Sequence, residues 1–423
     1  DPVVTALKAS ARFAEAVEPA VGLYEEPPTT ALEISTPWAD VRLTTQEWAD
    51  AFGAADPGTP HNEARDQVWD ELVEILVDKH AEFDAPEGAL RRALTRDEDL
   101  SRAFARAWPL LDARVVLADL WSVPAYLRRC APWLSPDDVQ RLQRDEPRAW
   151  TDADLPLLDA LRQRIGDPEA SSRRRRNEAL AAEEREQRDR VVDELIAADD
   201  SELMLMSILR GEDARNSLAD DAGFVGDPEM LAGPFAHVIV DEAQELTDAQ
   251  WQMLIRRCPS RSFTIVGDRA QARHGFPESW SERLDRVGFR HVTLATLDVN
   301  YRTPAEIMAV AEPVIRVALP DANVPTSIRE SGIPVMYGRR AELDGILTAW
   351  RAANPEGTAC VIGDPAHPET GRIRSLTPEL AKGLEFDLVV LVEPERFGTG
   401  IEGAVDRYVA MTRATRELVV LTA

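Results

Sequence analysis

The sequence predicts an α/β protein in which a helical part precedes a part built on parallel sheets. From residue 233 onward, short apolar segments rich in Val, Ile and Leu are each followed by a turn and a helix-forming stretch. Near-continuous apolar strands of this kind are typical of strands buried on both faces of a parallel sheet. Residues 31–165 are mostly helix-forming and hold seven of the ten tryptophans. We therefore expect two architectures in one chain.

The length and composition are those of a multidomain globular protein. The 423 residues allow two or three domains, 44% of them are hydrophobic, and no apolar run approaches the roughly 20 residues that span a bilayer. Three widely spaced cysteines predict neither a disulfide framework nor a zinc site, and they favour a cytoplasmic location. Because the first residue is Asp1 rather than Met, we expect a fragment of a longer protein.

The net charge bears on the choice of partner. With 48 Lys and Arg against 75 Asp and Glu, the chain carries a formal charge of −27. A protein that holds nucleic acid through phosphates needs a basic surface, and an acidic overall field repels it. We therefore expect nucleic-acid contact to be weak or indirect, although acidity that only maintains solubility would look the same.

The helical part begins with a predicted helix from Val3 to Val21. Further helix starts are predicted at the capping box Thr95-Arg-Asp-Glu98 and at Ser135-Pro136, where serine caps and proline takes the first helical position. The tryptophans are expected to pack in the core, with a partner-facing surface as the alternative for one or two of them.

Two charged segments separate the helical part from the sheets. Arg173-Arg-Arg-Arg176 leads into a charged helix predicted from Asn177 to about Asp199; the arginines are interpreted as a solvated helix face or as a nucleic-acid patch. Residues 199–231 then carry nine acids against two arginines, a net of −7, and predict a long loop.

Strands are predicted in the remainder of the chain, which should form the parallel sheets. They are Ala236–Val240, Ser262–Val266, Val292–Leu297, Ala359–Ile362, Leu388–Val392 and Leu418–Leu421.

The strongest motif is His237-Val-Ile-Val-Asp-Glu-Ala-Gln244, an apolar strand that ends in two carboxylates. Residues at this edge of a parallel sheet lie where ligands bind in open α/β folds. One carboxylate, Asp241, is suited to hold Mg²⁺, and the next, Glu242, to orient or deprotonate an attacking water. A solvated turn is the alternative reading of the motif taken alone.

Four further motifs follow in order. Thr264-Ile-Val-Gly-Asp-Arg-Ala-Gln271 ends in Gln271, which is suited to sense a γ-phosphate. Asn300-Tyr-Arg-Thr-Pro304 places Arg302 just before a helix, where a guanidinium reaches a triphosphate. Ala381-Lys-Gly-Leu-Glu-Phe-Asp387 leads into a strand, and Tyr408-Val-Ala-Met-Thr-Arg-Ala-Thr415 supplies Arg413 as a second such arginine.

This order of motifs resembles the UvrD/Rep group of superfamily 1 helicases. The resemblance covers residues 233–423 and implies two RecA-like domains with ATP and Mg²⁺ between them. It implies that Asp241 binds the metal and Glu242 is the catalytic base. It also implies nucleotide-binding or catalytic roles for the other motif residues, namely Gln271 at the γ-phosphate, Tyr301 stacked on adenine, Glu385 at the ribose, Lys382 and Gly383 beside the nucleotide, and Arg302 and Arg413 as arginine fingers.

The chain departs from that group in two ways. It contains no G-x-x-x-x-G-K-[ST] phosphate loop. Truncation is the simple explanation for the missing loop, and a degenerate ATPase is the alternative. In either case, this chain by itself is expected not to hydrolyse ATP. The segment Ala272-Arg-His-Gly-Phe276 also lacks the Tyr or Trp that stacks on single-stranded bases in the group. This departure disfavours a DNA-translocating helicase.

Within the group, the chain is most similar to the HelD family of RNA polymerase-associated ATPases, especially the actinobacterial branch. The helical block with Trp108-Pro-Leu-Leu111 and Trp150-Thr-Asp-Ala-Asp-Leu-Pro-Leu-Leu158, the acidic stretch 199–231 and the segment Leu376–Asp387 carry this likeness. It implies an ATP-driven factor that binds RNA polymerase, opens it, displaces nucleic acid and recycles the enzyme. A conventional 3′–5′ DNA repair helicase and a non-catalytic binding module are the alternatives.

The resemblance also implies a division into domains. The expected segments are a remainder of the first RecA-like domain (1–30), an inserted helical domain (31–165), a charged insertion (166–232), the rest of the first RecA-like domain (233–296) and a second RecA-like domain (297–423).

Overall fold

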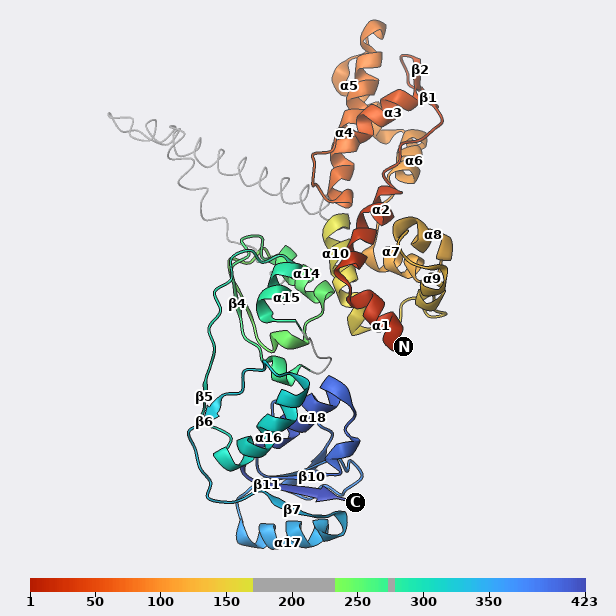
Figure 1. The fold of residues 1–423 in the computed structure, drawn as a ribbon. Coiled ribbons are helices and arrows are strands. Elements are labelled where there is room, and N and C mark those ends of the chain that lie inside the picture. Colours follow the sequence, from red (N-terminus) through yellow and green to blue (C-terminus); the bar gives the residue numbers. More distant parts are fainter. Residues whose placement is uncertain (170–232, 273–277) are drawn as a thin grey trace, which may run out of the picture. The chain divides into compact units, whose positions relative to one another are not determined.

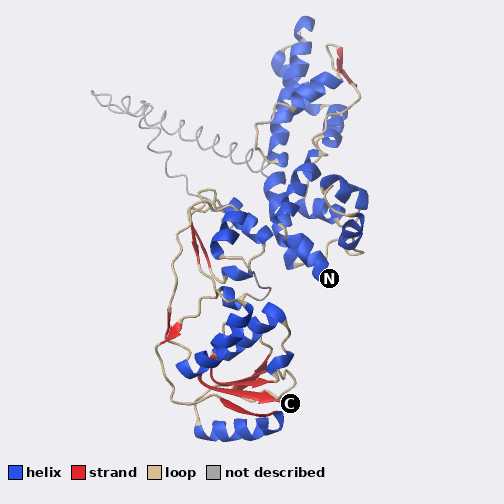
Figure 2. Ribbon diagram, viewed as in Figure 1, coloured by secondary structure: helices blue, strands red, loops and turns tan. Residues whose placement is uncertain are grey.

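The computed structural model describes residues 1–169, 233–272 and 278–423. They form two compact units: Asp1–Gly233 with Asp248–Arg257, and Pro234–Thr247 with Cys258–Ala423. The chain is mixed α/β, with helices and one antiparallel hairpin in the first unit and parallel sheets in the second (Figure 2). The predicted charged helix with its arginine run and the acidic stretch 199–231 lie outside the described residues.

The described part of the first unit is helical apart from the hairpin of β1 (Leu32–Ser35) and β2 (Asp40–Leu43). Its helices are α1 (Pro2–Ala9), η1 (Ala11–Ala16), α2 (Val17–Gly22), α3 (Thr45–Phe52), α4 (His61–Lys79), η2 (Ala81–Phe83), α5 (Glu87–Arg96), α6 (Glu98–Ala107), α7 (Ala113–Leu120), α8 (Pro124–Cys130), α9 (Pro136–Leu142), η3 (Asp152–Asp154), α10 (Leu155–Ile165) and α14 (Asp248–Arg257). No helix in the described ranges is long and apolar enough to cross a membrane.

Three helix predictions can be compared with the structure. The cap at Ser135 is confirmed, since its side chain accepts a hydrogen bond from the Asp138 N–H. The helix predicted from Val3 to Val21 is broken at Ser10, which is extended (φ −70°, ψ 133°) and caps η1 instead. The start predicted at Thr95 is wrong, because the Thr95 hydroxyl donates to the Arg91 carbonyl at 2.8 Å within α5.

The tryptophans of the first unit pack in two hydrophobic clusters, as expected. Trp48, Trp108 and Trp121 are buried, and the other four before residue 151 lie partly buried against the same clusters. Residues 1–30 are helical as far as Gly22, and their buried hydrophobic side chains share one cluster with residues 111–165.

A polar cluster lies where α4 begins. The ring nitrogens of the fully buried His61 lie 3.0 Å from Glu25 Oε1 and 2.8 Å from the Pro109 carbonyl oxygen. Arg164 donates to the second Glu25 oxygen at 2.7 Å. Burial on its own would raise the pKa of Glu25, but the hydrogen bonds from His61 and Arg164 lower it to about 2.

The second unit contains a five-stranded parallel sheet with the strand order β7-β11-β10-β8-β9. Its strands are β7 (Met336–Arg339), β8 (Ala359–Ile362), β9 (Ile373–Leu376), β10 (Phe386–Val392) and β11 (Ala414–Thr422). The helices of this unit are η4 (Ala243–Glu245), η5 (Arg269–Gln271), α15 (Trp280–Val287), α16 (Ala305–Ala318), η6 (Arg340–Glu342), α17 (Leu343–Ala353), η7 (Pro394–Arg396) and α18 (Gly400–Thr412).

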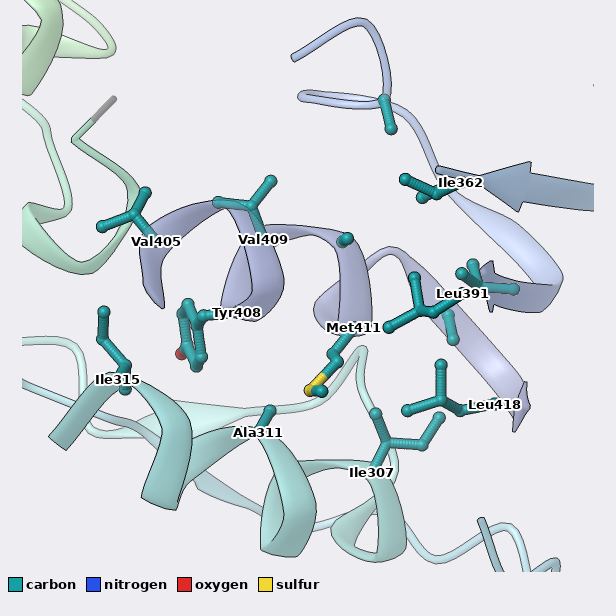
Figure 3. Close-up of a cluster of buried hydrophobic side chains, with 14 of the residues drawn as sticks. Ile307, Ala311, Ile315, Ile362, Leu391, Val405, Tyr408, Val409, Met411 and Leu418 are labelled. Carbon is teal, nitrogen blue, oxygen red and sulfur yellow. The ribbon is translucent and has the colours of Figure 1, made fainter. Parts of the chain in front are cut away.

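Alternate residues of the central strands face opposite layers, as period-2 side chains require. Val389 and Leu391 of β10 pack with α16 and α18 on one face, where Tyr408 and Met411 of α18 also lie (Figure 3). The intervening residues of β10 pack against α17 on the other face (Figure 1). The strands predicted at Ala359–Ile362, Leu388–Val392 and Leu418–Leu421 are therefore confirmed, with β10 and β11 longer than expected.

Two small parallel pairs complete the second unit: β3 (Val238–Val240) with β4 (Phe263–Ile265), and β5 (Val299–Asn300) with β6 (Thr326–Ser327). The strand predicted at Val292–Leu297 is wrong. That segment pairs with no described strand and its side chains are exposed, with Leu297 at 79%. Strand-forming residues form a ladder only when a neighbouring strand is present.

We predict that Glu25→Gln lowers the free energy of unfolding of the first unit near neutral pH by on the order of 3 kcal/mol. Because the folded-state pKa of Glu25 lies below its unfolded value, this stability is present above about pH 4.5 and is lost as the pH falls toward 2. Denaturant unfolding followed by helical circular dichroism measures the difference at each pH. The neighbouring, exposed Glu26 serves as the control, and Glu26→Gln should cost less than about 1 kcal/mol. A Glu25→Gln deficit that stays constant down to pH 2 would contradict the assignment.

Candidate functional site

Two of the motifs leave the same edge of the small β3–β4 sheet. The strands are parallel, so Asp241 and Glu242 after β3 lie at the same edge as the segment Gly267–Gln271 after β4. Gln244 ties the two turns together, because its Oε1 accepts the backbone N–H of Asp268 at 3.0 Å. The predicted carboxyl-edge placement of these residues is confirmed.

Glu242 has a backbone conformation that is unusual for a residue with a side chain. Its φ of 51° and ψ of 36° lie in the left-handed region, which costs of order 1 kcal/mol for a residue other than glycine. The Asp241 carboxylate accepts the Glu242 N–H at 2.8 Å and so supports this turn. Both side chains are exposed, and the strained turn directs the chain into η4.

The residues of the later motifs come from the opposite ends of their strands. Lys382, Gly383 and Glu385 precede β10, and Arg413 lies between α18 and β11, so these four lie at the amino ends of strands. Arg302 precedes α16, as expected, in the turn after β5. The site is therefore built from the carboxyl edge of the small sheet and the amino edge of the large one.

Helix η5 brings the two edges together. Ala270 is fully buried and belongs to the hydrophobic cluster between the large sheet, α16 and α18. Arg269 next to it forms an ion pair at 2.8 Å with Asp321, just past α16. This packing places Gln271 beside α18 and its end residue Arg413.

Direct contacts join the predicted site residues across this junction. Arg413 is 3% exposed, and its guanidinium donates to Gln271 Oε1 at 3.2 Å. The Lys382 ammonium donates to the Gln271 carbonyl oxygen at 2.9 Å, forms an ion pair with Glu245 and lies 3.6 Å from a carboxylate oxygen of Glu242.

A second ion pair forms beside this cluster, where Arg302 donates to Glu385 at 2.7 Å.

The electrostatics show that these charges act on one another. Burial, and next the nearby Arg302, lowers the pKa of the Arg413 guanidinium, whereas Glu242 and Glu385 act to raise it. Burial also raises the pKa of Asp268, and Glu242 adds to that rise against the opposing effect of its hydrogen bonds and of Lys382. The candidate base, both candidate arginines and Lys382 thus share one electrostatic environment.

A cavity of about 360 Å³ opens at this cluster, a size within the usual range for small-ligand sites. Five of the lining residues come from the motifs, Glu242, Gln271, Lys382, Gly383 and Val409, with Glu245, Pro378, Glu379, Val405 and Asp406 completing it. Gly383 has a φ of 77°, so any other residue there would be strained.

The remaining predicted residues lie outside the lining of this cavity: Asp241, Tyr301, Arg302, Glu385 and Arg413. Tyr301 is 78% exposed, so most of its ring is accessible to a planar group. In the parts of the chain that the structure describes, no group of three or more His, Cys, Asp or Glu side chains is arranged to hold a metal ion.

The structure adds three residues to which the sequence analysis gave no role: Gln244 and Asp268, which lie within the quoted motifs, and Glu245, which directly follows the first motif. Glu245 pairs with Lys382, Gln244 donates to Glu242, and Asp268 accepts from Gln271. The sequence signal was present, since all three are polar residues in turns directly after apolar strands. Their partners became visible only with the structure.

No family model and no curated protein matches the chain. Solved structures are similar over part of it. A PRRSV helicase is 17% identical with a TM-score of 0.28, over 44% of this chain and 34% of that chain. An Arterivirus nonstructural protein 10 helicase in complex with DNA is 18% identical with a TM-score of 0.29, over 49% of this chain and 50% of that chain. The C-terminal domain of a possible DNA helicase from Lactobacillus plantarum WCFS1 is 16% identical with a TM-score of 0.22, over 29% of this chain and 88% of that chain. This chain spans about a third of the length of the first and half of the second.

We predict that Gly267→Ala destabilises the second unit by about 1–3 kcal/mol. A methyl group at Gly267 would lie 2.7 Å from the Trp280 ring and 2.8 Å from Gln244 Oε1, so one of them must move. Gly345→Ala in α17 is the matched control, because its methyl group meets nothing within 4 Å and alanine favours a helix. Thermal unfolding of both variants tests the claim. Equal stability of the two would show that the turn after β4 is loosely packed.

Proposed function

We propose that the second unit binds a Mg²⁺-nucleoside triphosphate at the Glu242–Gln271–Arg413 cluster and belongs to an ATPase of the superfamily 1 helicase type. One observation carries the proposal: residues from four of the five motifs, Glu242, Gln271, Lys382 and Arg413, more than 170 positions apart at the extremes, meet within one unit around Gln271. The fifth motif joins them through the ion pair of Arg302 with Glu385. Chance placement of motif residues would scatter them over the surface.

The chemistry of the cluster suits phosphoryl transfer. Arg302 and Arg413 are cations of the kind that neutralise charge on a transferring phosphoryl group, and Glu242 is a carboxylate of the kind that takes a proton from an attacking water. The buried position of Arg413 strengthens its interaction with an anion, because few waters compete there. Tyr301 provides an exposed ring for the base.

The donor set also suits Mg²⁺, which takes one or two protein carboxylates and completes its shell with waters and phosphate oxygens. Asp241 would hold the ion, since one of its oxygens accepts the Glu242 N–H and the other is available. When bound, the ion would neutralise phosphate charge. The chain's own residues orient the water through Glu242 and receive the phosphate charge through the arginines.

We further propose that this ATPase acts on RNA polymerase, in the way that the resemblance to the HelD family implies. The net charge of −27 supports a protein that competes with nucleic acid rather than holding it. Trp280, the first Tyr or Trp after Gln271, packs against Gly267 and so is not a free stacking platform for a DNA base. This packing favours the polymerase reading over a conventional DNA helicase.

We predict that Glu242→Gln in the intact protein lowers kcat for ATP by at least about a hundredfold while leaving the nucleotide dissociation constant within a few-fold. The substitution removes the base and keeps the shape and the hydrogen-bonding capacity of the side chain. Steady-state turnover and equilibrium binding of a fluorescent ATP analogue measure the two effects. Glu379→Gln is the matched control, because Glu379 lines the same cavity but has no predicted catalytic role. Loss of binding together with turnover would instead indicate a structural role for Glu242.

We predict that the intact protein binds RNA polymerase with a submicromolar dissociation constant and binds duplex or single-stranded DNA much more weakly at physiological salt. Biolayer interferometry against both partners over a salt series tests this. Tight, strongly salt-dependent DNA binding without polymerase binding would favour the conventional helicase.

A further inference from the structure

We propose that Gln244 and Asp268 are positioning residues, which with Gln271 form a hydrogen-bonded relay from Glu242 to Arg413. The catalytic roles of Glu242 and Arg413, the two ends of the relay, rest on the proposed function. The relay itself is a property of side chains in the second unit and can be tested without nucleotide.

The relay has four consecutive links. Gln244 Nε2 donates to Glu242 Oε2 at 2.5 Å, and Gln244 Oε1 accepts the Asp268 N–H at 3.0 Å. Asp268 Oδ2 then accepts from Gln271 Nε2 at 2.8 Å, and Gln271 Oε1 accepts from Arg413 at 3.2 Å. The links run from the turn after β3, through the turn after β4, to the end of α18.

The donors and acceptors in this relay permit one arrangement only. A carboxylate accepts and a guanidinium donates, so the Gln271 amide between Asp268 and Arg413 must turn its nitrogen to the first and its oxygen to the second. The same logic orients Gln244, because one end faces a carboxylate and the other a backbone N–H. Gln244 is therefore fixed between the Glu242 carboxylate and the Asp268 backbone, and Gln271 is fixed between the Asp268 carboxylate and Arg413.

Close packing and burial support a specific role. Gln244 is 5% exposed, and its approach to Asp268 is possible because residue 267 has no side chain. Burial and the Glu242 charge raise the pKa of Asp268, which means that holding a carboxylate here opposes folding. Asparagine would avoid that cost, so the carboxylate is explained by its two acceptor oxygens, one for the Ala270 N–H and one for Gln271.

The relay also determines the direction in which Gln271 Oε1 would point when Arg413 moves. Movement of Arg413 toward a phosphate would free Gln271 Oε1, while Asp268 and Lys382 still hold the amide nitrogen and the backbone carbonyl. The freed oxygen would then face the cavity in a fixed direction. Glu242 at the far end would keep its orientation through Gln244.

The substitution Asp268→Asn tests the relay because asparagine has only one acceptor oxygen. If that oxygen keeps the Ala270 N–H, the asparagine amide must donate to residue 271, and Gln271 must turn its own NH₂ toward Arg413. Adding Gln271→Glu repairs the pattern, since a carboxylate at position 271 accepts both from the introduced asparagine amide and from Arg413. The double variant D268N/Q271E also keeps the total charge of the pair.

The first readout is the coupling free energy between residue 271 and Arg413, from thermal unfolding of a double-mutant cycle in the unliganded chain. We expect coupling in the wild type, none in D268N and recovery in D268N/Q271E. Coupling that D268N leaves unchanged, or that D268N/Q271E fails to restore, would overturn the relay. If D268N does not fold, Gln244→Leu removes the hydrogen bonds at the Glu242 end of the relay. This variant should lower the coupling free energy between Glu242 and Arg413 in the same kind of double-mutant cycle.

The second readout is steady-state turnover by the intact protein. We expect D268N to lower kcat about tenfold with KM for ATP little changed. A merely structural role for Asp268 would lower stability without this split between kcat and KM, and that result would overturn the positioning role. Absence of turnover in the wild type would refute the proposed function, while the coupling measurement would still decide the relay.

Discussion

The position of Ala270 is the constraint on which the site depends. Its side chain is fully buried in the cluster between α16, α18 and the five-stranded sheet, so the turn after β4 cannot move without opening that core. Gln271 follows directly and is thereby held beside Arg413. The contact between two motifs far apart in the sequence is thus a consequence of apolar packing, and the polar groups add orientation to a position that the core has already set.

The charges on the two sides of the site are complementary. The small sheet contributes Glu242 and Glu245, and the elements around the large sheet contribute Lys382, Arg302 and Arg413. Each cation has a carboxylate or carbonyl partner in this conformation, which offsets the cost of gathering like charges. A bound triphosphate would compete for the same cations, so binding would exchange internal ion pairs for contacts to phosphate. The strained Glu242 turn is consistent with a site held for chemistry rather than for stability.

The sequence was informative where a residue's environment is local. Buried strands such as Ala359–Ile362 were predicted residue for residue, because an apolar run bounded by turns has few alternatives. Of the predicted site residues, Glu242, Gln271, Lys382 and Arg413 lie together, and Arg302 pairs with Glu385 beside them. The failures come from non-local effects: Val292–Leu297 has strand-forming residues but no described partner strand, and β7 and β9 were missed because their exposed or charged positions hide the pattern. The site lies at the amino ends of β10 and β11, and Gln244 and Asp268 link it to the small sheet. Both features depend on how the two sheets meet, which no local sequence pattern encodes.

Photolabelling with 8-azido-ATP in the intact protein tests the central claim most directly, because it asks whether a nucleotide lies at this cluster. Tyr301 is the exposed ring beside Arg302, and the account predicts that the label attaches to the peptide containing Asn300–Pro304. Excess unlabelled ATP should abolish that labelling, and Tyr301→Ala should greatly reduce it. Labelling confined to peptides outside the second unit, or labelling that ATP does not compete away, would contradict the account.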